Sequence, residues 1–192
     1  MDKIQEIKNM KQYVLSIVSD NYNEGCGVMV GNMFITAGHV ISKCENPSIK
    51  WNGKNIPLIN PIVLRNDEND SVGYDIAVYS IPIANSPLAL SDIVPEKGEV
   101  LKSCSWRLLG EEYVECNAVV NGLKDGNYYA AETDDQLKSG SSGSPVFLNG
   151  KVVGILCAGN CNDDNTPCNT EWPLNLCVFL SSKVILELLE TN

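Results

Sequence analysis

The stretch Gly140-Ser141-Ser142-Gly143-Ser144-Pro145 lies between a polar run, residues 133–139, and an apolar run, residues 145–148. A serine with glycines two residues before it and one residue after it has the spacing of a nucleophile on a tight turn. Glycine permits positive φ, so the backbone N–H groups of such a turn can converge on one point, where a developing oxyanion would be stabilised. Taken alone, the hexapeptide is better explained as an ordinary flexible turn, because loops are rich in glycine and serine.

Two other segments supply the partners that a serine nucleophile needs. His39, the one histidine of the chain, follows an apolar segment, and Asp75 begins another. A base, a carboxylate that orients it and a hydroxyl are the groups of nucleophilic acyl transfer. Asp67 and Asp70 are rivals of Asp75, but they occur in a polar loop, and an orienting carboxylate works best on a rigid element.

Three boxes of the sequence resemble those of trypsin-like serine peptidases. Thr36-Ala37-Gly38-His39 resembles their histidine box, and Asp75-Ile76-Ala77-Val78 resembles their aspartate box. The segment 133–145 resembles the box Thr-Asp-Ala-Ala-Ile-Asn-x-Gly-Asn-Ser-Gly-Gly-Pro of the HtrA-like branch. The likeness extends over about residues 24–185, and no room is left for an appended PDZ domain. It implies a serine endopeptidase with Ser142 as nucleophile, His39 as base and Asp75 as the orienting carboxylate.

The resemblance also implies the remaining parts of the site. The backbone N–H groups of Gly140 and Ser142, assisted by Ser141, would form the oxyanion hole. Gln136 falls at the floor of the specificity pocket, which predicts an uncharged residue at the cleavage site, although a slip by one residue to Asp135 would reverse that preference. The residues implied to bind substrate are Gln136, Leu137, Cys157, Ala158 and Gly159. Ser144 departs from the family, which has glycine two residues after the nucleophile.

The implied fold is all-β and chymotrypsin-like, with two six-stranded antiparallel β-barrel lobes and short N- and C-terminal helices. We expect one peptidase domain, with His39 and Asp75 in a lobe of about residues 1–85 and Ser142 in a lobe of residues 96–192. A proline-containing crossover, residues 81–95, would join the lobes. The helices expected are one that begins at Asp2 and one over 183–189, capped by Ser181 or Ser182.

Turn chemistry between short apolar runs predicts the strands independently of the resemblance. Gly31-Asn32, Asn52-Gly53 and Asn149-Gly150 are each typical of a two-residue hairpin turn. Regular spacing of short strands favours a barrel. The strands expected are 13–18, 27–30, 33–36, 48–51, 54–57, 62–65, 75–79, 99–106, 113–120, 127–131, 146–148, 152–156 and 175–180.

The composition of the chain limits the kinds of molecule that it could bind. The net charge of −10 argues against nucleic acid or an anionic membrane as partner, and leaves a protein or peptide substrate, with an activating protein partner left open. The sequence has no apolar signal region and no run long enough to cross a membrane, which predicts a cytoplasmic chain or one excised from a longer precursor. We expect no cofactor and no metal in the active site.

Eight cysteines leave three interpretations open for the C-terminal half. Cys157, Cys161, Cys168 and Cys177 fit reduced structural thiols first, a Cys161–Cys168 disulfide second and a zinc site third. By resemblance, Cys26 and Cys44 bracket the histidine as a disulfide would in secreted relatives. Another pair, Cys104 and Cys116, is expected to face across a hairpin around Gly110. Since no cysteine occupies the nucleophile position, a cysteine peptidase is excluded.

Three function classes remain after this reading. The first is a serine endopeptidase, acting in regulation inside a cell or in processing a polyprotein. The second is a catalytically silent pseudo-peptidase that uses the cleft to bind extended peptide, against which the intact His39, Asp75 and Ser142 count. The third is an esterase or amidase with the same serine chemistry. A shared fold does not separate them.

Overall fold

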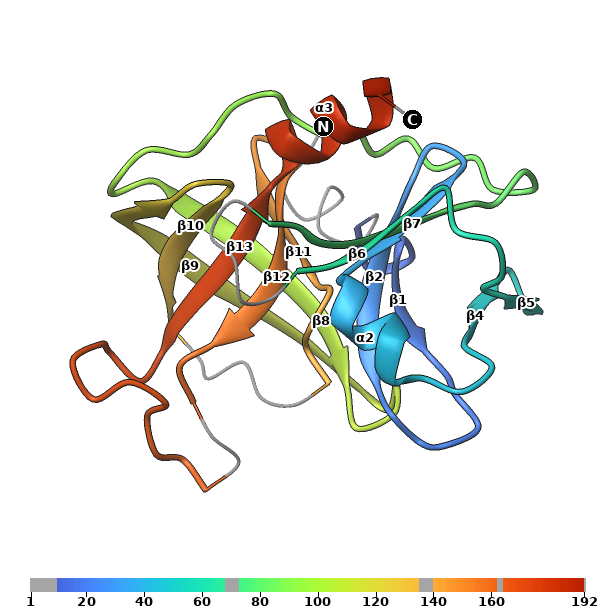
Figure 1. Cartoon of the computed structure of the whole chain (residues 1–192), viewed down its shortest axis with the longest axis horizontal. Coiled ribbons are helices and arrows are strands. Elements are labelled where there is room, and N and C mark those ends of the chain that lie inside the picture. The colour runs from blue at the N-terminus through green and yellow to red at the C-terminus, as the bar shows by residue number, and fades with distance from the viewer. Residues whose placement is uncertain (1–9, 68–72, 135–139, 162–163, 192) are drawn as a thin grey trace.

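Strands make up most of the regular structure, in agreement with the predicted all-β class. The computed structural model describes residues 10–67, 73–134, 140–161 and 164–191. We call strands β1–β7 the N-terminal lobe and strands β8–β13 the C-terminal lobe; they lie side by side in Figure 1. The predicted helix that begins at Asp2 falls on residues 1–9, outside the described part of the chain.

The N-terminal lobe is an antiparallel five-stranded sheet with a hairpin attached to it. The order in the sheet is β1-β2-β3-β7-β6, and the β4–β5 hairpin joins through a bridge between Val18 and Ser48. The bounds of these strands are β1 Val14–Ile17, β2 Gly25–Val30, β3 Met33–Thr36, β4 Ser48–Trp51, β5 Lys54–Pro57, β6 Val63–Asn66 and β7 Asp75–Ser80. A short helix, α2 (Gly38–Lys43), follows β3.

The C-terminal lobe is a closed six-stranded barrel in the order β10-β13-β12-β11-β8-β9. Its strands are β8 Val100–Arg107, β9 Glu112–Asp125, β10 Tyr128–Thr133, β11 Pro145–Leu148, β12 Lys151–Gly159 and β13 Leu176–Ser181. Tyr129 and Phe179 stack inside it with ring centroids 5.7 Å apart. Together the closed barrel, the second sheet and the short helices confirm the chymotrypsin-like fold.

The backbone conformation confirms two of the predicted hairpin turns, at Asn52-Gly53 and Asn149-Gly150. Asn52 and Gly53 both have positive φ, at 48° and 79°, and Asn149 and Gly150 have 51° and 78°. Only glycine and asparagine adopt this conformation readily, which is why the two dipeptides predict their turns.

The pairing of β8 with β9 corrects the expectation for Cys104 and Cys116. Cys104 pairs with Glu115, and Cys116 pairs with Ser103. Side chains alternate between the two faces of a strand, so the two thiols point to opposite faces and join different apolar clusters. The error is one residue of register, set by the length of the intervening turn.

The other expected disulfide and the helix cap also differ from the structure. Cys26 and Cys44 are thiols: Cys26 is fully buried, and the Cys44 Sγ lies 3.7 Å from the carbonyl oxygen of Asn23. The C-terminal helix is α3 (Ser182–Thr191). The Ser182 hydroxyl donates to the carbonyl of Ser91 at 2.6 Å, in the crossover, and the Ser181 hydroxyl has no partner among the described residues. Neither serine therefore caps the helix with its side chain.

The lobes share one apolar cluster, so they pack as a single body. It includes Val14 and Val28 from the first lobe and Phe147 and Ile155 from the second. At its edge the Trp106 indole N–H donates to the carbonyl of Val14 at 2.7 Å. The active-site residues predicted from the sequence lie on both sides of this junction.

Candidate active site

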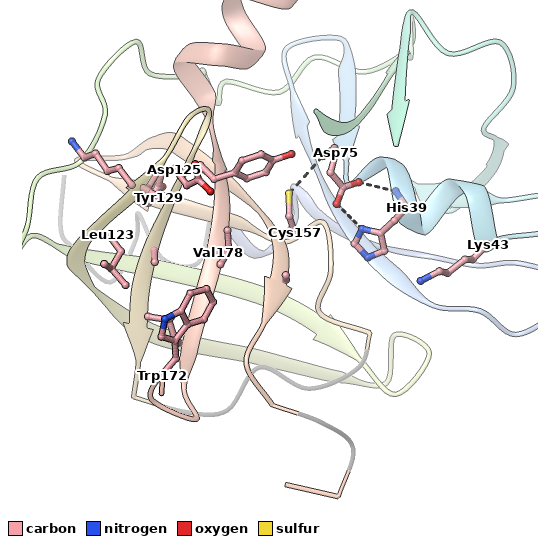
Figure 2. A pocket seen from close by; sticks show the side chains of 14 residues that line it. His39, Lys43, Asp75, Leu123, Asp125, Tyr129, Cys157, Trp172 and Val178 are labelled. Atoms are coloured by element: carbon pink, nitrogen blue, oxygen red, sulfur yellow. Dashed lines mark hydrogen bonds and ion pairs between the residues drawn. The ribbon is translucent and has the colours of Figure 1, made fainter. Parts of the chain in front are cut away.

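The start of α2 explains the glycine in Thr36-Ala37-Gly38-His39. A Cβ on Gly38 would lie 1.8 Å from the carbonyl oxygen of Arg65 on β6, so only glycine lets the helix approach this closely. The approach places His39, in the first turn of α2, beside the first residue of β7, Asp75. In Figure 2, Asp75 points at the His39 ring.

Asp75 holds His39 through two hydrogen bonds. One carboxylate oxygen, Oδ1, accepts the backbone N–H of His39 at 2.8 Å, and Oδ2 lies 2.6 Å from the ring Nδ1. The Asp75 side chain is 3% exposed and the His39 side chain 13% exposed. A carboxylate only accepts while ionised, so this contact assigns the ring proton to Nδ1 and leaves Nε2 as the acceptor of the neutral imidazole. That is the tautomer a general base requires.

The loop that carries Ser142 packs against the segment that precedes His39. Gly143 has a φ of +88°, and a Cβ there would lie 2.0 Å from the carbonyl oxygen of Cys26 and 2.3 Å from the Thr36 hydroxyl. The backbone N–H of Cys26 donates to the carbonyl of Ser142 at 2.8 Å. Thr36, in turn, donates to the carbonyl of Cys26 at 2.6 Å. Contacts across the lobe boundary therefore fix the nucleophile loop.

Gly140 has the second positive φ of this loop, at +94°. A Cβ there would lie 2.6 Å from the carboxyl carbon of Glu24. Glu24 is itself held by the backbone N–H of Leu109, which donates to its Oε2 at 2.7 Å. The backbone conformation therefore favours glycine here, whereas the Glu24 carboxylate, at the end of a flexible side chain, could move aside for a Cβ.

A cavity of about 870 Å³ opens beside His39 and Asp75. Cys157 and Ala158 on β12 contribute to its wall, and Trp172 and Val178 lie further along it (Figure 2). Its lining consists of His39, Lys43, Asp75, Leu123, Lys124, Asp125, Tyr128, Tyr129, Ala130, Cys157, Ala158, Trp172, Leu176 and Val178. The lining combines apolar side chains such as Leu123 and Val178 with the charged groups Lys43, Lys124 and Asp125.

Comparison with known protein families identifies the family of this chain. A sequence model described as a trypsin-like peptidase domain matches residues 25–155, which include all three boxes. The chain belongs to the family of trypsin-like peptidase domains. No curated protein sequence gives a significant match.

Solved structures of serine proteases share the fold of this trypsin-like peptidase domain. The serine endoprotease from Yersinia pestis has a TM-score of 0.74 and 17% identity, over 100% of this chain and 66% of that one. A Mycobacterium tuberculosis protease in its active form has a TM-score of 0.71 and 17% identity, over 96% and 82% of the two chains. A scabies mite inactivated protease paralogue has a TM-score of 0.69 and 15% identity, over 95% and 93%. At these identities the likeness shows the fold alone.

Some predicted residues of the peptidase domain lie where the structure describes nothing. Gln136 and Leu137 fall on residues 135–139, and Asp70 falls on residues 68–72, so their roles stay predictions. The other rival, Asp67, is exposed, and its backbone N–H donates to the carbonyl of Tyr74 at 2.8 Å. Gly159 lies at the exposed end of β12.

Tyr128 and Cys157 lie near Asp75, and the sequence did not predict their surroundings. The Cys157 Sγ lies 3.6 Å from the carbonyl oxygen of Asp75. Burial raises the pKa of the Tyr128 hydroxyl, and the nearby Cys157 and Asp75 raise it further. Tyr128 is therefore protonated and uncharged at neutral pH. In the sequence, the only sign of this arrangement is that Tyr128 follows the Asp125–Gly126 turn. That turn does not show which lobe the Tyr128 ring faces.

The described residues contain no group of three or more His, Cys, Asp or Glu side chains arranged to hold a metal ion. Within the same ranges, no helix has the length and apolar character needed to cross a bilayer.

Proposed function

We propose that this trypsin-like peptidase domain is a serine endopeptidase whose catalytic residues are His39, Asp75 and Ser142. The observation that carries the proposal is the 2.6 Å contact between His39 Nδ1 and Asp75 Oδ2, formed beside the loop that bears Ser142. The fold cannot carry it, because one structure of the same fold is an inactivated paralogue. The side chains of His39 and Asp75 and the hydrogen bonds between these residues support the proposal.

The proposed reaction proceeds through an acyl-enzyme. The Ser142 hydroxyl attacks the scissile carbonyl while His39 Nε2 takes its proton, and Asp75 stabilises the imidazolium that forms. The backbone N–H groups of Gly140 and Ser142, with that of Ser141 close by, would donate to the oxyanion. His39 then protonates the leaving amine. Water, deprotonated by His39, releases the acyl group from Ser142.

The substrate that we propose is a protein or peptide bound in the cavity beside His39. An extended chain would pair with the end of β12, where Cys157, Ala158 and Gly159 offer a strand edge. The proposed biological role is proteolysis inside a cell, either in regulation or in processing a longer polypeptide. An activating protein partner is compatible with this role.

The test is intact-protein mass after incubation with a fluorophosphonate probe. We expect one adduct on the wild-type protein, and none on Ser142→Ala or His39→Ala. A folded wild-type protein without an adduct would overturn the proposal in favour of a peptide-binding module. Cleavage of a protein substrate, absent in Ser142→Ala, separates an endopeptidase from an esterase or amidase.

A further inference from the structure

Ser144 occupies the position two residues after Ser142, where the resembling family has glycine, and it is completely buried. Its backbone N–H donates to the carbonyl oxygen of Ser141 at 3.1 Å, and its hydroxyl donates to the same oxygen. The carbonyl of Ser141 therefore accepts two hydrogen bonds from one residue. A glycine could provide only the first of them.

The Ser144 hydroxyl is itself oriented by a neighbour on β8. The hydroxyl oxygens of Ser144 and Ser105 lie 2.8 Å apart, and both serines have no exposed surface. The Ser144 hydroxyl lies within donating distance of both Ser105 Oγ and the Ser141 carbonyl, and the Ser105 hydroxyl lies 3.4 Å from the carbonyl oxygen of Trp106. A serine hydroxyl donates one hydrogen bond and a carbonyl can only accept, so donation from Ser144 to Ser141 requires that Ser105 donates to Ser144 in place of Trp106. The pair acts as a short relay that ends on the nucleophile loop.

Cys26 of the N-terminal lobe completes this buried group. Its Sγ accepts the backbone N–H of Trp106 at 3.5 Å, and the nearby hydroxyls of Ser144 and Ser105 oppose the rise that burial causes in the pKa of its thiol. Because unpaired polar groups are costly in a protein interior, these side chains restrain one another. The restraint spans both lobes.

The orientation of the Ser141 carbonyl determines the direction of a catalytic donor. In a planar trans peptide, the carbonyl of one residue and the N–H of the next point in opposite directions. With the Ser141 carbonyl turned toward the buried Ser144, the N–H of Ser142 must point the other way, out of the interior. This N–H is one of the two proposed oxyanion donors.

We propose that Ser144 is a positioning residue, whose hydroxyl, oriented by Ser105, holds the Ser141–Ser142 peptide with its N–H directed at the oxyanion. The inference rests on the proposed function. It assigns a role to the residue by which this chain departs from the family pattern. Replacing Ser144 by glycine would remove the hydroxyl that Ser105 contacts at 2.8 Å and the second hydrogen bond to the Ser141 carbonyl.

The test compares Ser144→Ala with a matched control, Ser103→Ala, by steady-state kinetics on a peptide substrate. Ser103 is equally buried on β8, and its hydroxyl has no partner among the described residues, so its loss removes no hydrogen bond. We expect Ser144→Ala to lower kcat by roughly 10- to 100-fold, since an oxyanion donor becomes misaligned. KM should stay within about twofold of the wild-type value, as expected for an interaction used in the transition state. Ser103→Ala should match the wild type in both constants.

A second readout separates positioning from general stabilisation. A peptide aldehyde forms a tetrahedral adduct that uses the oxyanion hole, whereas a peptide with the scissile carbonyl reduced to methylene does not. Ser144→Ala should weaken the aldehyde by the same factor as kcat and leave the reduced peptide unaffected. Equal affinity of both ligands for the variant and the wild type, with only a lower melting temperature, would overturn the inference.

The failures of the two proposals are distinguishable by the fluorophosphonate reaction. A wild-type protein that forms no adduct overturns the proposed function and this inference with it. A wild-type protein that reacts, beside a Ser144→Ala protein that reacts at the same rate, overturns the inference alone. If Ser144→Ala does not fold, Ser105→Ala replaces it, with an expected loss in kcat of a few-fold; an unchanged kcat in that variant contradicts the relay.

Discussion

The two halves of the candidate site are held in place by different means. His39 and Asp75 come from neighbouring elements of one lobe, and the Asp75 carboxylate contacts both the backbone N–H and the ring of His39. The loop of Ser142 comes from the other lobe, and backbone atoms and buried hydroxyls across the boundary restrain it. The position of the proposed base is therefore set by a local pair, whereas the position of the proposed nucleophile depends on how the lobes dock. The two halves should fail differently when they are mutated.

The largest expected effect is on the local pair. Asp75→Asn should lower kcat/KM by roughly 10³- to 10⁴-fold, because an amide can donate to Nδ1 and favour the wrong tautomer of His39. The fold should be retained, since asparagine has the same size. Steady-state kinetics on a peptide substrate would measure the loss.

Asp67→Asn is the matched control for this variant, because Asp67 was the rival carboxylate and lies exposed on the loop before β7. Its kinetics should equal those of the wild type. If only Asp67→Asn lost activity, Asp67 would be the carboxylate that orients His39, and the assignment of that role to Asp75 would be wrong.

The next effect concerns the docking of the lobes. Gly143→Ala would place a Cβ 2.0 Å from the carbonyl oxygen of Cys26, at a φ of +88°. We expect the free energy of unfolding to fall by roughly 3 kcal/mol or more, together with loss of activity. Urea denaturation measures the first, and fluorophosphonate labelling the second.

Gly150→Ala controls for backbone strain without the clash. Gly150 has a φ of +78°, and nothing lies within 4 Å of its added Cβ. It should cost only about 1–2 kcal/mol, the penalty of the left-handed conformation, and it should remain active. Equal losses in both variants would mean that close lobe contact at Gly143 is unimportant.

The smallest expected effect is the pH dependence of stability that the buried Cys177 thiol gives to the C-terminal barrel. Burial raises the pKa of the Cys177 thiol from 9.0 to about 11. A folded-state pKa above the unfolded value means that the folded protein binds more protons between these values. This contribution to stability is full below pH 9 and is lost as pH rises through about 11, and it amounts to on the order of 2 kcal/mol.

Unfolding of wild type and Cys177→Ala at pH 8 and pH 10.5 would measure this contribution, with the exposed Cys168→Ala as control. The stability lost between these pH values should be smaller in Cys177→Ala than in the other two proteins. An identical pH dependence in all three would show that the thiol is not protected by the barrel.

Local chemistry made much of the fold predictable from the sequence. Asn52-Gly53 and Asn149-Gly150 predict their turns because few other residues adopt the required φ. His39 and Asp75 could be paired in advance because one follows an apolar run and the other begins one, within two boxes that resemble those of trypsin-like peptidases. The register of Cys104 against Cys116 was wrong because one residue of turn length decides it, and no pattern in the strands reports that length.

Contacts between the lobes could not be predicted in the same way. Cys26 and Ser105 are ordinary buried strand residues in the sequence, and nothing local reveals that both meet Ser144. The departure from glycine at Ser144 was visible, but its meaning depends on a hydroxyl 39 residues away in the chain. Long-range docking, which no local pattern encodes, determines the nucleophile half of the site.

We propose that this domain cleaves peptide bonds through Ser142. The most direct measurement is mass spectrometry of a peptide library after incubation with the wild-type protein or with Ser142→Ala. We predict cleavage at internal peptide bonds by the wild type, with uncharged residues preferred before the cleaved bond, and no cleavage by Ser142→Ala. Equal cleavage by both proteins, or an intact library with a folded wild-type protein, would contradict the account.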